Sequence, residues 1–271
     1  MTAYILQKHH AGVTTLIMNR PKRLNGWTMP MMDALKEAIQ QADEDPAVSA
    51  IVLTGTDPYY SAGVHLGGTL TLAHPRKLHA DIVAHNQALF DVFLDCETPI
   101  LAAINGPAIG ACVTSATLCN AIVASENATF STPFSRLGIP PEGCSSVLFP
   151  RLLGDDAQRM LGEEGWTPTA EEARAAGLVQ WVVPHDQLLQ RAQDIAQQWV
   201  QDGVTRQFPG GFQRDELKAV NAEESLRLAT AFLSPPFLMG QFRFLWGRRK
   251  RGLALLFLLL RWMHPLWRHL L

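Results

Sequence analysis

Short apolar runs alternate with helically spaced apolar positions along the first half of the chain. Buried strands are predicted over residues 13–18, 50–54, 100–104 and 121–124, each of which ends near a turn signal. Helices are predicted between them, over residues 31–42, 76–94 and 110–118. Strands that alternate with helices imply crossover connections, so we expect an α/β fold.

Beyond residue 150 the pattern becomes mainly helical. Thr169 and Glu172 have the spacing of a capping box, and Gly177 lies where that helix should end. One more strand is predicted over 179–183, and helices are predicted over 186–202, 213–234 and from 237 onward. A Pro-Gly-Gly sequence marks the best candidate boundary, so we expect an α/β core over residues 1–206 and a helical region over 207–271.

The composition fits a packed globular protein, but its charge is unevenly distributed. The 271 residues are 47% hydrophobic and 18% charged, which excludes a disordered chain. The net charge is only −2, yet residues 225–271 hold eight Lys and Arg and no acid. Such an excess predicts an anionic partner. The near-neutral total argues against a protein whose whole surface binds nucleic acid.

Several common signals are absent from the sequence. It contains no phosphate-binding loop, no G-x-S-x-G and no H-E-x-x-H, so we expect neither a nucleotide cofactor nor a metal site. The four cysteines form no close pair, which favours a reducing compartment. The N-terminus does not resemble a secretory signal, and the C-terminal His-Leu-Leu is not a peroxisomal signal, so we expect a cytoplasmic protein.

Three segments carry candidate chemistry. Residues 60–66 and 104–111 are glycine-containing turns whose free N–H groups would suit an oxyanion, although each also fits an ordinary turn before a helix. The third segment, residues 137–146, holds a single acid, Glu142, among uncharged residues. Burial would raise the pKa of this carboxyl and suit it to general base catalysis. A solvent-exposed turn cap is the alternative interpretation.

Together these segments resemble the crotonase superfamily, the enoyl-CoA hydratase/isomerase family. The resemblance covers about residues 4–230 and rests on the motifs Asn19-Arg20-Pro21, Ser61-Ala62-Gly63, Asn105-Gly106-Pro107 and 173–179. It implies a spiral of ββα turns with a helical C-terminal part, in a homotrimer or a dimer of trimers. It also implies an acyl-CoA thioester substrate, no separate cofactor, and an oxyanion hole formed by the backbone N–H groups of Val64 and Ala111.

Within the family, the sequence closely resembles the peroxisomal-type Δ3,Δ2-enoyl-CoA isomerases. Hydratases carry two glutamates, and the corresponding positions here are Thr114 and Phe134. The segment around Glu142 instead resembles the isomerases, whose single catalytic base is that glutamate. The resemblance thus implies conversion of 3-enoyl-CoA to 2-enoyl-CoA by Glu142. An enoyl-CoA hydratase-like enzyme of other specificity and a non-catalytic acyl-CoA-binding protein are the alternatives.

Contacts to the substrate are implied by the same motifs. Basic residues at 20, 22 and 23 lie where the family places its first contacts to CoA phosphates. His65 replaces an acid that the family usually carries, so it either contacts CoA or faces solvent. The residues expected to bind substrate are Arg23, Leu24, Ser61, Ala62, Gly63, His65, Leu66, Gly110 and Phe134.

The basic C-terminal segment departs from the family pattern after about residue 244. It combines three tryptophans, the cluster 248–251 and the apolar run 253–260, which as a helix would be apolar all round. The run is too short to span a bilayer, which needs roughly 20 residues. Three interpretations remain open: packing into a trimer interface, peripheral binding to a membrane surface, and an exposed extension.

Overall fold

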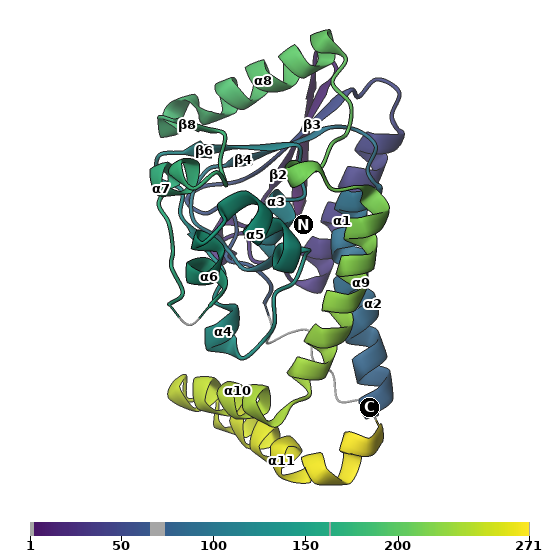
Figure 1. Ribbon diagram of the computed structural model, residues 1–271, viewed down its shortest axis with the longest axis vertical. Coiled ribbons are helices and arrows are strands. Elements are labelled where there is room, and N and C mark those ends of the chain that lie inside the picture. The colour runs from purple at the N-terminus through teal and green to yellow at the C-terminus, as the bar shows by residue number, and fades with distance from the viewer. Residues whose placement is uncertain (1–2, 66–73, 163, 271) are drawn as a thin grey trace.

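A largely parallel sheet forms the centre of the computed structural model, which describes residues 3–65, 74–162 and 164–270 (Figure 1). Its strands lie in the order β1-β2-β3-β4-β6-β8, and only β1 runs antiparallel to its neighbour. Their bounds are β1 Ile5–His10, β2 Val13–Met18, β3 Ala50–Gly55, β4 Ile100–Ile104, β6 Ala121–Ser125 and β8 Trp181–Val183. A second, two-stranded sheet pairs β5, Ala108–Ile109, with β7, Phe130–Ser131. The expected α/β class is confirmed.

Helices cover both faces of the central sheet. The longer ones are α1 Met29–Glu44, α2 Pro75–Asp95, α8 Leu188–Asp202, α9 Arg214–Phe232, α10 Pro235–Gly247 and α11 Arg251–Trp267. The shorter ones are α3 Ala111–Ala116, α4 Phe134–Leu137, α5 Ser145–Leu153, α6 Asp156–Leu161 and α7 Ala170–Ala175. Short 3-10 turns lie at Pro21–Arg23, His185–Gln187, Pro209–Gly211 and Arg268–Leu270.

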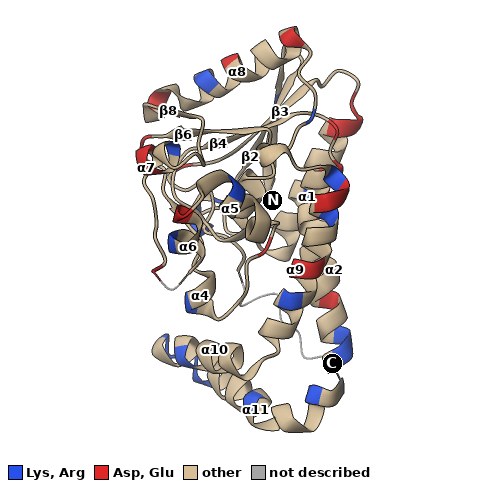
Figure 2. Cartoon of the chain, viewed as in Figure 1, with Lys and Arg blue, Asp and Glu red and all other residues tan. Residues whose placement is uncertain are grey.

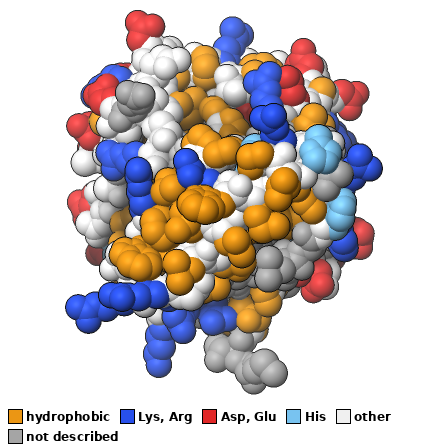
Figure 3. Space-filling view, turned by 90° about the horizontal axis from the view of Figure 1, so that it is seen from below, with side chains coloured by type: hydrophobic (Ala, Val, Ile, Leu, Met, Phe, Trp, Pro, Cys, Tyr) orange, Lys and Arg blue, Asp and Glu red, His pale blue; other side chains and the backbone are white. Residues whose placement is uncertain are grey.

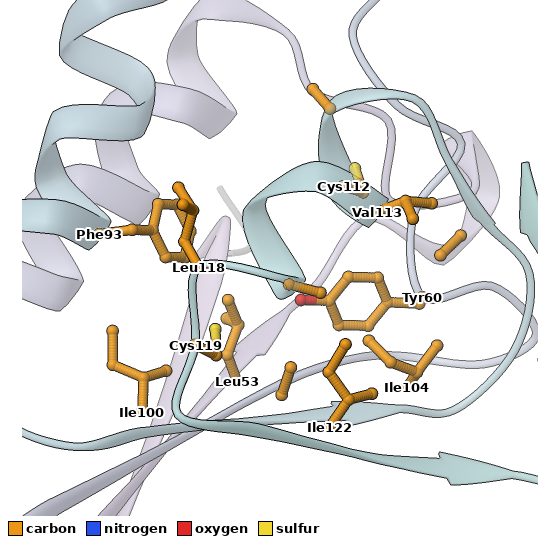
Figure 4. Close-up of a cluster of buried hydrophobic side chains, with 14 of the residues drawn as sticks. Leu53, Tyr60, Phe93, Ile100, Ile104, Cys112, Val113, Leu118, Cys119 and Ile122 are labelled. Carbon is orange, nitrogen blue, oxygen red and sulfur yellow. The ribbon is translucent and has the colours of Figure 1, made fainter. Parts of the chain in front are cut away.

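Alternation along the strands divides the core between these two layers. Val52 of β3 and Leu101 of β4 face α8, which covers the upper side of the sheet in Figure 1. Leu53 and Ile100 belong to the opposite, larger cluster, which also holds side chains of α1, α2 and α3. Figure 4 shows part of this second layer, including two of the four cysteines, all of which are buried and free. Both faces are therefore apolar, as expected for parallel strands.

The C-terminal helices continue from the core without a separate sheet. After α8 the chain crosses a coil, and α9 then packs along α2 (Figure 1). The proposed boundary at residue 206 falls in this coil and stays a prediction. Beyond α9, where helix was predicted from 237 onward, the chain forms two helices, α10 and α11. Arg249 adopts a positive φ of 59° between them, which turns α11 back against α10.

Candidate active site

An apolar cavity of about 360 Å³ lies where the two glycine turns, α2, α4 and α9 meet. Its walls are mostly aliphatic, and they include Met29, Leu78, Ile82, Leu89, Leu228 and Phe232. Two of the lining side chains are acids, Glu142 and Asp81. Because Asp81 forms an exposed ion pair with Lys77, Glu142 is the acid that the cavity isolates from water.

The first glycine turn is fixed from inside the protein. The buried hydroxyl of Ser61 donates to the carbonyl oxygen of Asn25 at 2.8 Å and accepts from the N–H of Gly63 at 3.1 Å. Gly63 has a φ of +80°, and its carbonyl oxygen accepts from the N–H of Trp27 at 2.8 Å. The N–H of the next residue, Val64, donates to no partner among the described residues. Val64 itself lines the cavity.

The second turn presents a similar free donor. Gly110 has a φ of +64° and directly precedes α3, whose first residue is Ala111. The first N–H groups of a helix have no partner in the preceding turn, and that of Ala111 finds none in the described part of the chain. Ala111 lines the cavity, so its N–H group is placed beside the same space as that of Val64.

Direct backbone hydrogen bonds hold the two turns together. The N–H of Ser61 donates to the carbonyl oxygen of Pro107 at 3.3 Å, and the N–H of Ile109 donates to that of Ser61 at 3.0 Å. The contact is close enough that a Cβ added at Gly63 would lie 2.4 Å from the carbonyl oxygen of Ile109. Only glycine permits this approach, so the spacing between the two donors depends on it.

Glu142 occupies the loop between α4 and α5 and is 7% exposed. The hydroxyl of Ser145 donates to the backbone carbonyl oxygen of Glu142 at 2.8 Å, which helps to hold this loop. Burial, and secondarily the negative charge of Glu224, raise the pKa of the Glu142 carboxyl from 4.5 to about 8. Such a carboxyl can accept a proton from a bound molecule and give it back, which is what a single acid–base group requires.

A second buried acid, Glu224 of α9, holds the loop that carries Glu142. Its two carboxylate oxygens accept from the N–H groups of Cys144 at 2.6 Å and Ser146 at 2.9 Å. Gly143 and Cys144 both have positive φ, so this loop turns sharply into α5. Glu224 was not among the residues predicted to act at the site. Its position three residues after buried Asn221 and four before buried Leu228 was an available signal that it faces the core.

The expected site residues fall into three groups. Seven line the cavity: Ala62, Gly63, Val64, Gly110, Ala111, Phe134 and Glu142. Ser61 is fully buried beneath the first turn and acts through its hydrogen bonds, while Arg23, Leu24 and His65 are exposed outside the lining. Leu24 nevertheless touches the turn, since its carbonyl oxygen accepts from the N–H of Ala62 at 2.9 Å. Leu66 lies outside the described residues.

Positions that distinguish related chemistries are also visible. Thr114 is fully buried on α3, and its hydroxyl donates to the carbonyl oxygen of Ala111 at 3.2 Å. It lies against the loop of Glu142, since a Cβ added at Gly143 would be 2.6 Å from this hydroxyl. Trp27 is fully buried, with its indole N–H directed to the sulfur of Met18. Among the described residues, the cavity thus combines one buried carboxyl with two backbone N–H groups that have no partner there.

Comparison with known proteins finds matches over most of this chain. The family model described as enoyl-CoA hydratase/isomerase matches residues 8–223. Human enoyl-CoA delta isomerase 2 is 34% identical over 238 residues, which cover 82% of this chain and 58% of the human protein. Mouse enoyl-CoA delta isomerase 3, peroxisomal, is 36% identical over 66% of this chain and 57% of its own length. The chain thus spans less than two thirds of these relatives.

A solved structure shows the same architecture. The enoyl-CoA hydratase/isomerase from Pseudoalteromonas atlantica T6c has a TM-score of 0.76 and 27% sequence identity. The alignment covers 89% of this chain and 96% of that chain.

Proposed function

Because the chain belongs to the enoyl-CoA hydratase/isomerase family, we propose that it converts a 3-enoyl-CoA to the 2-enoyl-CoA. The observation that carries the proposal is the pairing of one buried carboxyl, Glu142, with two free backbone donors in an apolar cavity. The similarity to proteins named delta isomerases supports the same reaction.

The mechanism requires one proton to move between two carbons. The Glu142 carboxylate removes a proton from C2, and the electron pair moves into the thioester, so that negative charge develops on its oxygen. The N–H groups of Val64 and Ala111 donate to this oxygen, and such donors each stabilise a transition state by about 3–4 kcal/mol. Glu142 then returns the proton to C4 as the double bond settles between C2 and C3. No atom is gained or lost.

The raised pKa of Glu142 suits both halves of this cycle. A carboxyl with a pKa of about 8 is a stronger base than an ordinary glutamate, which helps it remove a weakly acidic C2 proton. The first step leaves this carboxyl protonated, so it is ready to donate the proton to C4. The aliphatic walls keep water from the dienolate and strengthen the two hydrogen bonds to its oxygen.

The residues that line the cavity also disfavour the addition of water to the substrate. A hydratase needs a second acid–base group to activate water, and Thr114 and Phe134 occupy the two positions that the family uses. Among the described lining residues, Asp81 is the only other acid, and it pairs with Lys77 at the surface. We therefore expect hydration of 2-enoyl-CoA to be slow relative to isomerisation.

CoA itself is proposed to bind along the first 3-10 turn. Lys22 and Arg23 lie on this exposed turn, and Arg20 stands just before it with its guanidinium 4.8 Å from the ring of Tyr4. The turn leads directly to Leu24, which touches the first glycine turn. Phosphates held here would lie on the chain segment that adjoins the oxyanion donors.

The direct test compares Glu142→Gln with the wild type in two assays of the purified protein, 3-enoyl-CoA isomerisation and 2-enoyl-CoA hydration. We expect the variant to lose isomerase activity by about 10²–10⁴-fold, the contribution typical of general acid–base catalysis. Glu44→Gln, which changes an exposed acid at the end of α1, is the matched control. Retention of the wild-type isomerase rate by Glu142→Gln would refute the mechanism.

A further inference from the structure

The two last helices form a hairpin at one end of the molecule. α10 and α11 pack against each other below α4 and the end of α9 (Figure 1). We call residues 235–267 the C-terminal hairpin. In the described chain, Ala254 is the only fully buried residue of α11, so this helix contributes little to the core. Six of its large apolar side chains are exposed.

One face of α11 carries a continuous apolar stripe. Leu255, Leu259, Trp262, Met263 and Leu266 follow the spacing of a single helical face, and all are exposed. Trp262 is 76% exposed and Leu266 69%. Phe244 and Trp246 of α10 are also exposed, and Figure 3 shows apolar side chains as a broad band on this end of the molecule.

This concentration of apolar surface is specific to the hairpin. Of the twelve large hydrophobic side chains that are exposed in the described chain, eight belong to α10 and α11. The other four are single leucines on separate elements: Leu6, Leu24, Leu189 and Leu226. Scattered exposed leucines are ordinary, whereas a contiguous patch of this kind marks a binding surface.

The same hairpin carries positive charge without any acid. Its Lys and Arg are Arg243, Arg248, Arg249, Lys250, Arg251 and Arg261, and Arg268 follows α11 directly. Within the described part of the chain, none of them forms an ion pair. Figure 2 shows basic residues on both helices and no acidic ones, and Figure 3 places basic side chains around the apolar band.

Aromatic side chains connect the charged and apolar parts. The guanidinium of Arg248 lies 4.6 Å from the ring centre of Phe244, and that of Arg251 lies 5.1 Å from that of Trp246. Tryptophan and arginine at the edge of an apolar face are typical of helices that lie in the boundary between lipid headgroups and acyl chains. The combination matches a surface that is apolar within and anionic at its boundary.

The positive charges of the hairpin favour a lipid surface over a second copy as the partner of the apolar stripe. In the described chain, the other exposed large apolar side chains are single leucines on separate elements, so the hairpin of a second copy is the surface that offers a matching exposed stripe. That contact would bring two acid-free basic surfaces together and be repulsive. An anionic phospholipid surface instead supplies phosphates for the cations and acyl chains for the stripe.

We propose that the C-terminal hairpin binds the surface of an anionic phospholipid bilayer. The stripe of α11 enters the boundary between headgroups and acyl chains, and the cations of the turn at 248–251 contact lipid phosphates. The binding is peripheral, since no helix in the described chain has the length and apolar content to cross a membrane. The proposal is independent of the isomerase reaction.

Flotation of the full-length protein with vesicles tests the proposal. We expect the wild type to float with vesicles of phosphatidylcholine that contain roughly one third phosphatidylglycerol and to stay unbound with phosphatidylcholine alone. High salt should weaken the binding because it screens the cations. Failure of the wild type to bind the anionic vesicles at low salt would overturn the proposal.

Two sets of variants separate the apolar and the charged contributions. Leu259→Gln with Leu266→Gln should abolish flotation, whereas Leu226→Gln, an equally exposed leucine of α9, should leave it unchanged. Changing Arg248, Arg249 and Lys250 to Gln should weaken binding about a hundredfold, since each cation contributes about fivefold near an anionic surface. The charge control changes Lys8, Arg174 and Arg191, which are exposed on the body, and should bind like the wild type.

Light scattering without lipid identifies the competing explanation. If the Leu259→Gln, Leu266→Gln variant keeps the wild-type mass and loses flotation, the stripe acts on lipid as proposed. If the variant floats like the wild type, the stripe is not needed for lipid binding and the proposal is wrong. If its mass falls because subunits separate, the stripe is an interface between copies and the proposal is also wrong.

Discussion

The variant Glu142→Gln should gain stability relative to the wild type as the pH rises. The carboxyl of Glu142 has a pKa raised from 4.5 to about 8, mainly by burial. In the unfolded chain it ionises near 4.5, while in the folded protein it keeps its proton up to about pH 8. The unfolded state therefore binds fewer protons across this window, and the free energy of unfolding falls as the pH rises through it.

The size of the effect follows from the two pKa values. Each tenfold change in proton affinity corresponds to about 1.4 kcal/mol, so the full penalty above pH 8 is about 5 kcal/mol at most. A domain is stable by only about 5–15 kcal/mol, so a loss of this size is easily measured. Glu142→Gln keeps the shape of the side chain but cannot ionise, which removes the pH-dependent part of the penalty.

Urea unfolding at pH 5 and pH 9 measures this difference. The amide introduced by the substitution adds an offset that is the same at both pH values, so the informative quantity is the change of the stability difference with pH. We expect Glu142→Gln to gain a few kcal/mol over the wild type between pH 5 and pH 9. The exposed control Glu44→Gln should show a constant offset. A constant offset for Glu142→Gln would show that its carboxyl is not perturbed as described.

Three further predictions concern catalysis. The kcat/KM for isomerisation should rise about tenfold per pH unit up to about pH 8 and then level, because Glu142 must be ionised to act as the base; a flat profile would contradict this role. Glu224→Gln removes a negative charge that raises the pKa of Glu142, so the midpoint of this pH profile should move to lower pH. The kcat should also fall, because the loop of Glu142 loses a charged hydrogen-bond acceptor. An unmoved midpoint would refute the electrostatic effect of Glu224 on Glu142. Gly63→Ala should lower kcat about 10²-fold, since its Cβ would force the first turn away from Ile109. Gly138→Ala, which has a similar positive φ but open space around it, should reduce thermal stability and keep kcat; equal kcat in both variants would argue against the need for close turns.

The buried elements of the fold were predictable because their side chains are uniformly apolar. Residues 13–18 and 100–104 are strands with the expected bounds, and the capping box of Thr169 and Glu172 is present. β1 was missed because it is an edge strand whose side chains are mostly exposed, so it shows no apolar run. β5 and β7 have only two residues each and depend on pairing with each other, which no local pattern reveals.

The candidate site was predictable only in part. Glycine spacing located the two turns, and an isolated acid pointed to Glu142, because both are local features of the chain. The wall of the cavity formed by α2 and α9 was not predictable, since Leu78 and Phe232 reach the cavity only after these helices pack together. The turn within the hairpin was not predicted, because it depends on how α11 packs against α10. Leu253, Leu255 and Leu259 of the apolar run are exposed in the described chain, and what covers this run stays a prediction.

A small apolar cluster at the end of α9 adjoins the cavity, so a bound substrate would add contacts to it. Leu228, Phe232 and Phe237 form a minor core with Ile82 and Ile139, and four of these five side chains also line the cavity. The cluster is therefore incomplete on the side where an acyl chain would lie. A bound chain would fill that side and add apolar contacts to the corner between α9 and α10. Amide hydrogen exchange of these helices should slow when the cavity is filled, so the ligand itself would help to fix the C-terminal hairpin in place.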